Sequence, residues 1–194
     1  CLAVFDRQVS YGLDSNLHAV SLAKKSKNYE KVFLVNSYKI PLKNNSVDLV
    51  FVNCVFEHIK GLEQTLTEIN RVLKNNGLLI FTVPTDRFAN YSIFSFLQLN
   101  PLAKLYGWLR NKKYQHYHCY SLATWISLLK KYSFRVNDHF YYINKKETEL
   151  WDFLLFIRWP YRQLLRNIIH RKIINGRMAD DRAAAIAIAA QKNA

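Results

Sequence analysis

Polar side chains stand where predicted strands end, and the first of them is Asp14. It follows the short apolar stretch Val9 to Leu13, which is typical of a strand. A carboxylate at the carboxyl edge of a parallel sheet can accept hydrogen bonds from both ribose hydroxyls of a nucleoside cofactor. Taken alone, Asp14 is explained at least as well as a turn or capping residue. Ser15 is the candidate N-cap of the helix that follows.

Histidines supply the second candidate chemistry, which is proton transfer. His58 directly follows Glu57, and an imidazole that titrates near neutral pH can act as a general base. A structural histidine bonded to the backbone explains His58 equally well. His116, His118 and Cys119 lie close together in the sequence, but this compact set lacks a second cluster of ligands, so we expect no metal site.

Strands alternate with helices in the first half of the chain, and these elements must position the candidate residues. We expect strands over 9–13, 31–35, 47–52 and 78–83. The apolar run Val47 to Val52 predicts a strand buried on both faces. Helical spacing of apolar residues predicts helices after Ser15 and over 61–73, the second stopped by Asn75-Asn76-Gly77, because Asn and Gly tolerate positive φ. This alternation is typical of an α/β fold with a mostly parallel sheet.

The second half of the chain is richer in aromatic residues. Residues 88–109 predict a helical insertion or lid, and Ser121 is expected to cap a helix that runs through Tyr132. We predict a strand over 134–143 and helical structure over 147–175. Residues 183–190 are mostly alanine, which favours helix. The alternation of Ile186 and Ile188 favours a final strand instead.

Composition sets the class of protein. The chain has 194 residues, of which 50% are hydrophobic and 22% charged, so it can fold as one globular domain. It has no apolar run long enough to span a membrane. Three cysteines without CxxC spacing argue against a disulfide framework or a zinc ribbon. A reducing, cytoplasmic compartment is therefore the simplest expectation.

Positive charge is concentrated in the second half. The formal net charge is +14, with ten basic and seven acidic residues over 1–84 and eighteen basic and seven acidic residues over 85–194. A basic excess is compatible with nucleic acid, an anionic membrane surface or an acidic substrate. Because the excess lies outside the predicted cofactor half, it points to a surface or to the approach of a substrate.

Four segments, in this order, resemble the class I S-adenosylmethionine-dependent methyltransferases, most closely the small-molecule branch that includes quinone- and lipid-methylating enzymes. They are Tyr11-Gly12-Leu13-Asp14, Ile40 to Val50, Val55 to Ile59 and Glu68 to Pro84. The resemblance covers about residues 9–84 and resumes weakly over 116–134. It implies a doubly wound, mostly parallel Rossmann-like sheet, S-adenosylmethionine as cofactor, and methyl transfer to a small-molecule or lipid-like acceptor.

The resemblance also implies roles for individual residues. Asp14, with Ser15, would meet the ribose, and Asn36 stands where the family often has an aspartate facing the adenine. The amide of Asn36 can accept the same hydrogen bond without charge. The remaining residues implied for the cofactor are Ser37 beside the adenine and Asn53 and Cys54 near the methionine part.

For the methyl acceptor, the resemblance places His116 and Tyr120 in the pocket, with His58 and His116 as candidate catalytic residues. In-line methyl transfer needs alignment above all. A base matters only where the acceptor must lose a proton. The thiol of Cys54 is better explained as an ordinary buried small side chain.

One departure from the family pattern is large. The family begins with a strand and a glycine-rich turn, and no such turn occurs in these 194 residues. We therefore expect an N-terminally truncated domain that lacks the first strand, with the glycine-rich turn encoded upstream. As given, the chain should bind the cofactor poorly and be inactive.

The predicted organisation is an α/β domain over 1–146 and 179–194, with an aromatic lid at 85–115 and a basic amphipathic helical insertion at 147–178. Arg162, Arg166 and His170 share one face of that insertion. Residues 147–177 could meet an anionic membrane, or simply cap the active site.

The sequence favours other partners and functions less. Nucleic acid is not favoured, because the aromatic residues lie in apolar clusters, and no obligate protein partner is evident. The rival functions are a non-catalytic methyltransferase-like scaffold and a nucleic-acid methyltransferase or binder.

Overall fold

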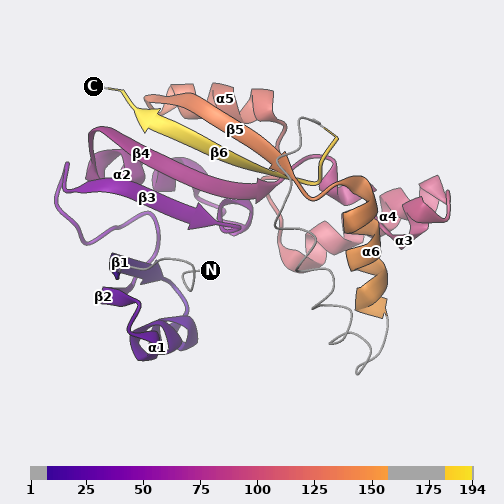
Figure 1. Ribbon diagram of the computed structural model, residues 1–194, viewed down its shortest axis with the longest axis horizontal. Helices are drawn as coiled ribbons and strands as arrows, with labels where there is room; N and C mark the ends of the chain where they lie inside the picture. Colours follow the sequence, from indigo (N-terminus) through magenta and orange to yellow (C-terminus); the bar gives the residue numbers. More distant parts are fainter. Residues whose placement is uncertain (1–7, 157–181, 194) are drawn as a thin grey trace.

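The computed structural model describes residues 8–156 and 182–193 (Figure 1). Strands and helices alternate along most of this chain. In order they are β1 (Val9–Asp14), α1 (Leu17–Ser26), β2 (Tyr29–Leu34), β3 (Val47–Asn53), η2 (Phe56–His58), α2 (Leu62–Val72), β4 (Leu73–Pro84), η3 (Phe88–Asn90), α3 (Ile93–Phe96), α4 (Asn100–Tyr114), α5 (Leu122–Lys131), β5 (Phe134–Tyr142), α6 (Lys145–Phe156) and β6 (Ala185–Lys192).

The strands form two sheets. β1 and β2 pair in parallel, and a second sheet has the order β3-β4-β6-β5. In that sheet β3 and β4 are parallel, whereas β6 is antiparallel to both β4 and β5. Three of its four strands therefore run in one direction, which confirms the predicted α/β fold with a mostly parallel sheet. The final strand is confirmed too, and it lies between β4 and β5.

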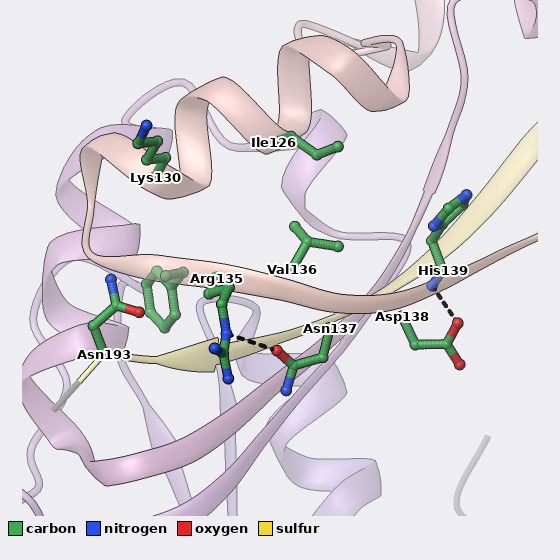
Figure 2. Close-up of a pocket in the computed structure, with 9 residues that line it drawn as sticks. Ile126, Lys130, Arg135, Val136, Asn137, Asp138, His139 and Asn193 are labelled. Atoms are coloured by element: carbon green, nitrogen blue, oxygen red, sulfur yellow. Dashed lines mark hydrogen bonds between the residues drawn. The ribbon is translucent and has the colours of Figure 1, made fainter.

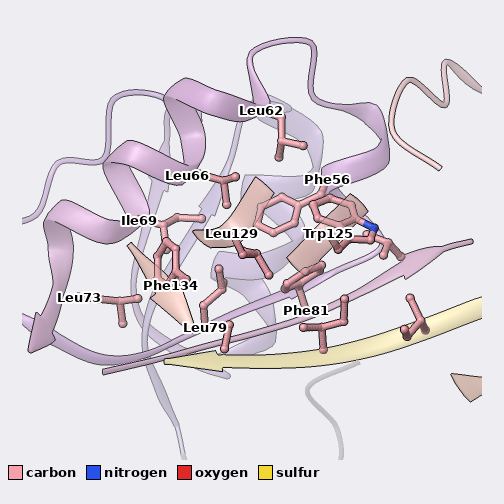
Figure 3. Packing of buried hydrophobic residues seen from close by; sticks show 14 residues of the cluster. Phe56, Leu62, Leu66, Ile69, Leu73, Leu79, Phe81, Trp125, Leu129 and Phe134 are labelled. Carbon is pink, nitrogen blue, oxygen red and sulfur yellow. The ribbon is translucent and has the colours of Figure 1, made fainter. Parts of the chain in front are cut away.

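The hydrophobic core lies between the larger sheet and the helices α2 and α5 (Figure 3). Phe56, Phe81 and Trp125 form its aromatic centre, with ring centroids 5.0 to 6.1 Å apart. Leu66 and Leu129 come from the two helices and are completely buried. Ile186 and Ile188 of β6 are also completely buried. Their alternate positions put both isoleucines on the core face of the strand, which explains why the alanine-rich segment is a strand.

The prediction that β3 is buried on both faces is wrong. Val50 and Val52 pack against the core, but Leu49 and Phe51 are 51% and 43% exposed. Because successive side chains of a strand point to opposite faces, one face of β3 is covered and the other is open. Among the described strands, β3 and β1 are also edge strands of separate sheets.

Caps at two helix ends differ from the predictions. Asn16, not Ser15, caps α1, because its Oδ1 accepts from the backbone N–H groups of His18 and Ala19. α2 ends at Val72 with Leu73 as its extended C-cap, so the prediction that Asn75-Asn76-Gly77 stops this helix is wrong: the three residues lie within β4. The positive φ of 62° there belongs to Asn76 and not to Gly77. Gly77 is required for space instead, since a Cβ there would lie 2.8 Å from the carbonyl oxygen of Lys74. Ser121 caps α5 as predicted and accepts from Thr124 N–H.

A helical insertion, which we define as η3, α3, α4 and α6, packs at one end of the larger sheet (Figure 1). The helical structure predicted over 88–109 is confirmed and continues to Tyr114. Of the predicted helix over 147–175, the structure describes α6, which begins at Lys145. The rest of that segment, with Arg162, Arg166 and His170, lies outside the described residues. No helix within the described ranges is long and apolar enough to cross a membrane.

Candidate functional site

The carboxyl ends of β3 and β4 hold the first group of predicted site residues. Thr82 of β4 donates from Oγ1 to Asn53 Oδ1 (2.7 Å) and accepts at its carbonyl from Cys54 N–H (3.0 Å). Cys54 turns the chain out of the sheet with φ 51°. Cys54 is exposed, so the expectation of an ordinary buried side chain is wrong, although partial desolvation raises the pKa of its thiol. The structure thus brings Asn53 and Cys54 to one strand end, with Cys54 a neutral thiol.

Glu57 is the unexpected member of this region. Its side chain is 2% exposed, and its Oε2 has no hydrogen-bond partner within the described structure. Burial raises the pKa of this carboxyl group. A buried carboxyl group without a partner is costly, and such groups concentrate at functional sites. Sequence reasoning identified the Glu-His pair but assigned the chemistry only to His58.

Cys119 and Tyr142 complete the surroundings of Glu57. Burial, and next the negative charge of Glu57, raise the pKa of Cys119 to about 12. Burial also raises the pKa of Tyr142, with Cys54 and Glu57 adding to the effect. Tyr142 lies at the end of β5, so the ends of three strands, β3, β4 and β5, contribute residues to the surroundings of Glu57. The fold brings Tyr142 to this region, and the sequence carried no signal that could identify Tyr142 as a site residue.

His58 and His116, the two residues predicted to be catalytic, lie next to each other. Their ring centroids are 4.8 Å apart, and His58 Nε2 is 3.8 Å from Glu57 Oε1. The Tyr117 N–H donates to the Glu57 carbonyl oxygen (2.6 Å), which ties this segment to η2. Burial, then the charges of His58 and Arg110, lower the pKa of His116 to about 4. At neutral pH, His116 is therefore an uncharged imidazole.

Hydrogen-bond partners define which nitrogen of each histidine is basic. His58 Nδ1 lies 3.0 Å from the carbonyl oxygen of Tyr114, and His116 Nδ1 lies 3.3 Å from Asn111 Oδ1. Both partners are acceptors, so each Nδ1 carries the proton and each Nε2 keeps a lone pair. These hydrogen bonds thus leave the Nε2 lone pairs of the two histidines available.

Tyr120 is half-buried, and both its hydroxyl and its ring contact other residues of the protein. His118 Nε2 donates to the carbonyl oxygen of Ile59 (2.8 Å), which leaves His118 Nδ1 to accept from the Tyr120 hydroxyl (2.7 Å). The ring of Tyr120 packs 5.4 Å from that of Trp125. Tyr120 therefore supports the chain that carries His116, and its hydroxyl has a partner.

The predicted ribose and adenine residues belong to the other sheet and its exit loop. Asp14 ends β1, and its Oδ1 accepts from Asn16 N–H (2.8 Å), which is the turn role left open by the sequence. Ser15 is exposed in the same turn. Asn36 Nδ2 donates to the Tyr38 hydroxyl (3.0 Å). Ser37 and Thr65 of α2 share a hydrogen bond of 2.8 Å.

A surface pocket of about 490 Å³ lies elsewhere, between α5 and β5 (Figure 2). Its polar lining residues are Lys130, Arg135, Asn137, Asp138, His139 and Asn193. β5 is an edge strand in the described sheet, and none of the candidate site residues lines this pocket. The pocket therefore belongs to the outer edge of the sheet.

Residues 2–81 match a protein family described as methyltransferase domain. The chain is 42% identical to malonyl-[acyl-carrier protein] O-methyltransferase 1 of Coxiella burnetii over 72 residues. This aligned segment covers 37% of this chain and 23% of that protein. It is 36% identical to an uncharacterized protein of Methanocaldococcus jannaschii over 78 residues, and this aligned segment covers 40% of this chain and 34% of that protein. The matches thus span about a quarter to a third of these relatives.

The fold has solved counterparts. A SAM-dependent methyltransferase from Thermotoga maritima superimposes with a TM-score of 0.64 at 18% identity, over 95% of this chain and 73% of the other. At this identity the similarity concerns the fold alone.

Proposed function

The chain belongs, through residues 2–81, to the class I S-adenosylmethionine-dependent methyltransferases, and from this premise we propose that it serves methyl transfer to a small-molecule or lipid-like acceptor. The family implies S-adenosylmethionine as the cofactor. When bound, it supplies an electrophilic methyl group on a sulfonium sulfur. The observation that carries the proposal is an uncharged His116 next to His58, close to the buried carboxyl group of Glu57, whose Oε2 has no hydrogen-bond partner within the described residues.

Asp14 fits the cofactor's ribose. It stands at the carboxyl end of a parallel strand, and its side chain is exposed. One oxygen already accepts from Asn16 N–H, but an ionised carboxylate has about four lone-pair positions. The second oxygen can accept from ribose hydroxyls without breaking the turn.

His116 would take the proton of the acceptor. With the cofactor bound, its methyl group would pass to the acceptor heteroatom, and the sulfur would leave as a neutral thioether that keeps the electron pair of the broken bond. The proton released by the acceptor passes to His116 Nε2, which is neutral at physiological pH. The neighbouring carboxyl of Glu57, 3.8 Å from His58, can stabilise the imidazolium charge that develops on the histidine pair.

The acceptor class decides whether this base is needed. The relative from Coxiella burnetii is named an O-methyltransferase of a malonyl group. A carboxylate acceptor is already deprotonated at neutral pH and needs no base, whereas a phenol, alcohol or amine does. A rate that depends on His116 would therefore favour a protonated acceptor.

We further propose that the complete methyl-transfer unit has one more parallel strand between β1 and β3. The support is that both are edge strands in the described structure and that each pairs in parallel with its neighbour. Edge strands with free pairing groups accept a further strand. A glycine-rich turn after such a strand would bring backbone N–H groups to the cofactor.

Calorimetric titration with S-adenosylmethionine tests the cofactor site. We expect Asp14→Ala to weaken binding by about tenfold or more, since a charge-assisted hydrogen bond is lost. Asp48→Ala, which removes an exposed carboxylate paired with Lys74, is the matched control. Equal affinity of wild type and Asp14→Ala would remove the ribose assignment.

Radiolabelled methyl transfer tests the base. In a form of the protein that catalyses methyl transfer, His116→Asn should lower the rate of transfer to a protonated acceptor about 100-fold or more. The same substitution should leave the affinity for the cofactor unchanged. His139→Asn, an exposed histidine on β5, is the control.

A non-catalytic scaffold is the second candidate, favoured by the separation of the two sheets. It predicts no cofactor binding, even in a protein that supplies the additional strand. Binding that appears only when this strand is present would support the enzyme and the added strand together.

A further inference from the structure

In the helical insertion, the acidic side chains are buried or half-buried, whereas the lysines are exposed. Glu149 and Asp152 of α6 are buried, at 5% and 0% exposure. Asp152 pairs with Arg110 and Glu149 with Lys145. Glu147 is half-buried and accepts from Asn144 N–H. The acidic side chains of α6 are thus directed into the protein, and η3, α3 and α4 contain none.

Apolar side chains cover the outer face of α4. Leu105 and Trp108 are 54% and 58% exposed, and Leu102 and Leu109 are exposed to a similar degree. These residues are three, four and seven apart, so they share one face of the helix. The preceding segment adds exposed Phe96, Leu97 and Leu99. We call this set, from Phe96 to Leu109, the apolar patch.

Lysines border the apolar patch. Lys104, Lys112 and Lys113 are exposed on α4, and Lys112 lies 5.2 Å from the centre of the Trp108 ring. Lys145 and Lys146 are exposed on the neighbouring α6. An exposed face with Leu and Trp at its centre, lysines at its border and no exposed acid on α4 is the arrangement of a helix that lies in a membrane interface.

We propose that the apolar patch and its bordering lysines dock on an anionic lipid membrane. The leucines and Trp108 would enter the boundary between headgroups and acyl chains, while the lysines would meet anionic headgroups. Charge complementarity selects this occupant. A second copy of the chain would bring lysines against lysines, and nucleic acid would favour stacking aromatics over leucines at the centre. The proposal rests on the surface alone and does not depend on the proposed methyl transfer.

Vesicle flotation of the full 194-residue chain tests the proposal. Vesicles of phosphatidylcholine mixed with phosphatidylglycerol should carry the protein, vesicles of phosphatidylcholine alone should carry much less, and added salt should release it. No binding to the anionic vesicles at low salt would overturn the proposal, as would equal binding to both kinds.

Paired substitutions locate the surface. Leu105→Ser with Leu109→Ser should weaken partitioning about tenfold or more. The matched control is Leu17→Ser with Leu22→Ser, which changes two exposed leucines of α1. Circular dichroism melts would verify that each variant folds. A loss with the α1 pair, and none with the α4 pair, would place the contact elsewhere and overturn the proposal.

The lysines need a test of their own. Replacing Lys104, Lys112 and Lys113 by glutamine should weaken partitioning on the order of 100-fold. Replacing Lys24, Lys25 and Lys27 of the α1 region is the charge-matched control. Equal losses in the two triple variants would mean attraction by net charge only and would refute the assigned face.

Two further measurements separate the other occupants. Light scattering that shows a dimer dissociated by the Leu105 and Leu109 substitutions would assign the patch to a second copy. RNA that competes with the vesicles through the same residues would assign it to nucleic acid. Either result would overturn the membrane assignment.

Discussion

Removal of the carboxylate of Asp152 should open the helical insertion without unfolding the sheet. Asp152 is completely buried and binds the Arg110 guanidinium at 2.9 Å, while also accepting from the Tyr106 hydroxyl (2.9 Å) and Ile93 N–H (3.0 Å). These contacts connect α6 with α3 and α4. In Asp152→Ala, the buried charge of Arg110 loses its counterion.

The expected cost follows from burial of both partners, at 2% and 0% side-chain exposure. Breaking a buried ion pair by removing one partner costs about 3–5 kcal/mol. Arg110 would keep its bonds to the carbonyl oxygens of Phe88 and Tyr91 and its place over the Phe88 ring. The double variant Arg110→Met with Asp152→Leu removes both charges. It should cost less, about 1–3 kcal/mol, because no buried charge is left without a counterion, and only neutral groups (the donors of Tyr106 and Ile93 and the carbonyl oxygens of Phe88 and Tyr91) lose a partner.

Hydrogen exchange with mass spectrometry measures this cost locally. Amides of 88–114 and 145–156 should exchange faster in Asp152→Ala, on the order of 100- to 1000-fold, while amides of β4 and β6 keep their protection. Lys131→Ala breaks an exposed ion pair with Glu63 and should change little. A double variant as unstable as Asp152→Ala, or a loss of protection spread evenly over the sheet, would refute the reasoning.

Three further predictions concern single residues. His116→Gln should flatten the dependence of the urea midpoint on pH between about 4 and 6.5: burial lowers the pKa of His116 to about 4, so the unfolded chain binds more protons in that window and stability falls as the pH is lowered. An unchanged slope would contradict it. Gly107→Ala should expose the same amides as Asp152→Ala, since a Cβ at Gly107 would overlap the carbonyl of Ala89; unchanged exchange would show that the backbone there adapts. Asn16→Ala should destabilise α1 by about 1 kcal/mol through loss of the cap, as chemical denaturation can measure, with Ser15→Ala as a neutral control.

Periodic segments of the chain could be predicted from the sequence. The strands ending at Asp14 and Asn53, the helix α2 and the final strand β6 follow local patterns of apolar residues. Burial of β3 was overestimated, because an apolar run shows that a strand is hydrophobic but not what lies on each face. The covering of Val50 and the exposure of Leu49 depend on elements remote in sequence.

Of the candidate site, the sequence pointed to the histidines but not to their surroundings. The structure places the rings of His58 and His116 next to each other, and their catalytic role stays a prediction. Glu57 was passed over, because a glutamate in a short loop carries no sign of burial. The interior position of Arg110 was equally hidden, since its counterion, Asp152, lies 42 residues further along the chain.

The position of β6 has a consequence for the order in which the chain can fold. β6 lies between β4 and β5 and pairs with both, yet it is the last described element of the sequence. Contacts such as Leu79 with Ala190 join residues more than a hundred positions apart, and such long-range pairing makes folding slow. During synthesis, β4 and β5 have no strand between them until residues 185–192 have left the ribosome. The larger sheet can therefore be completed only after β6 has been translated.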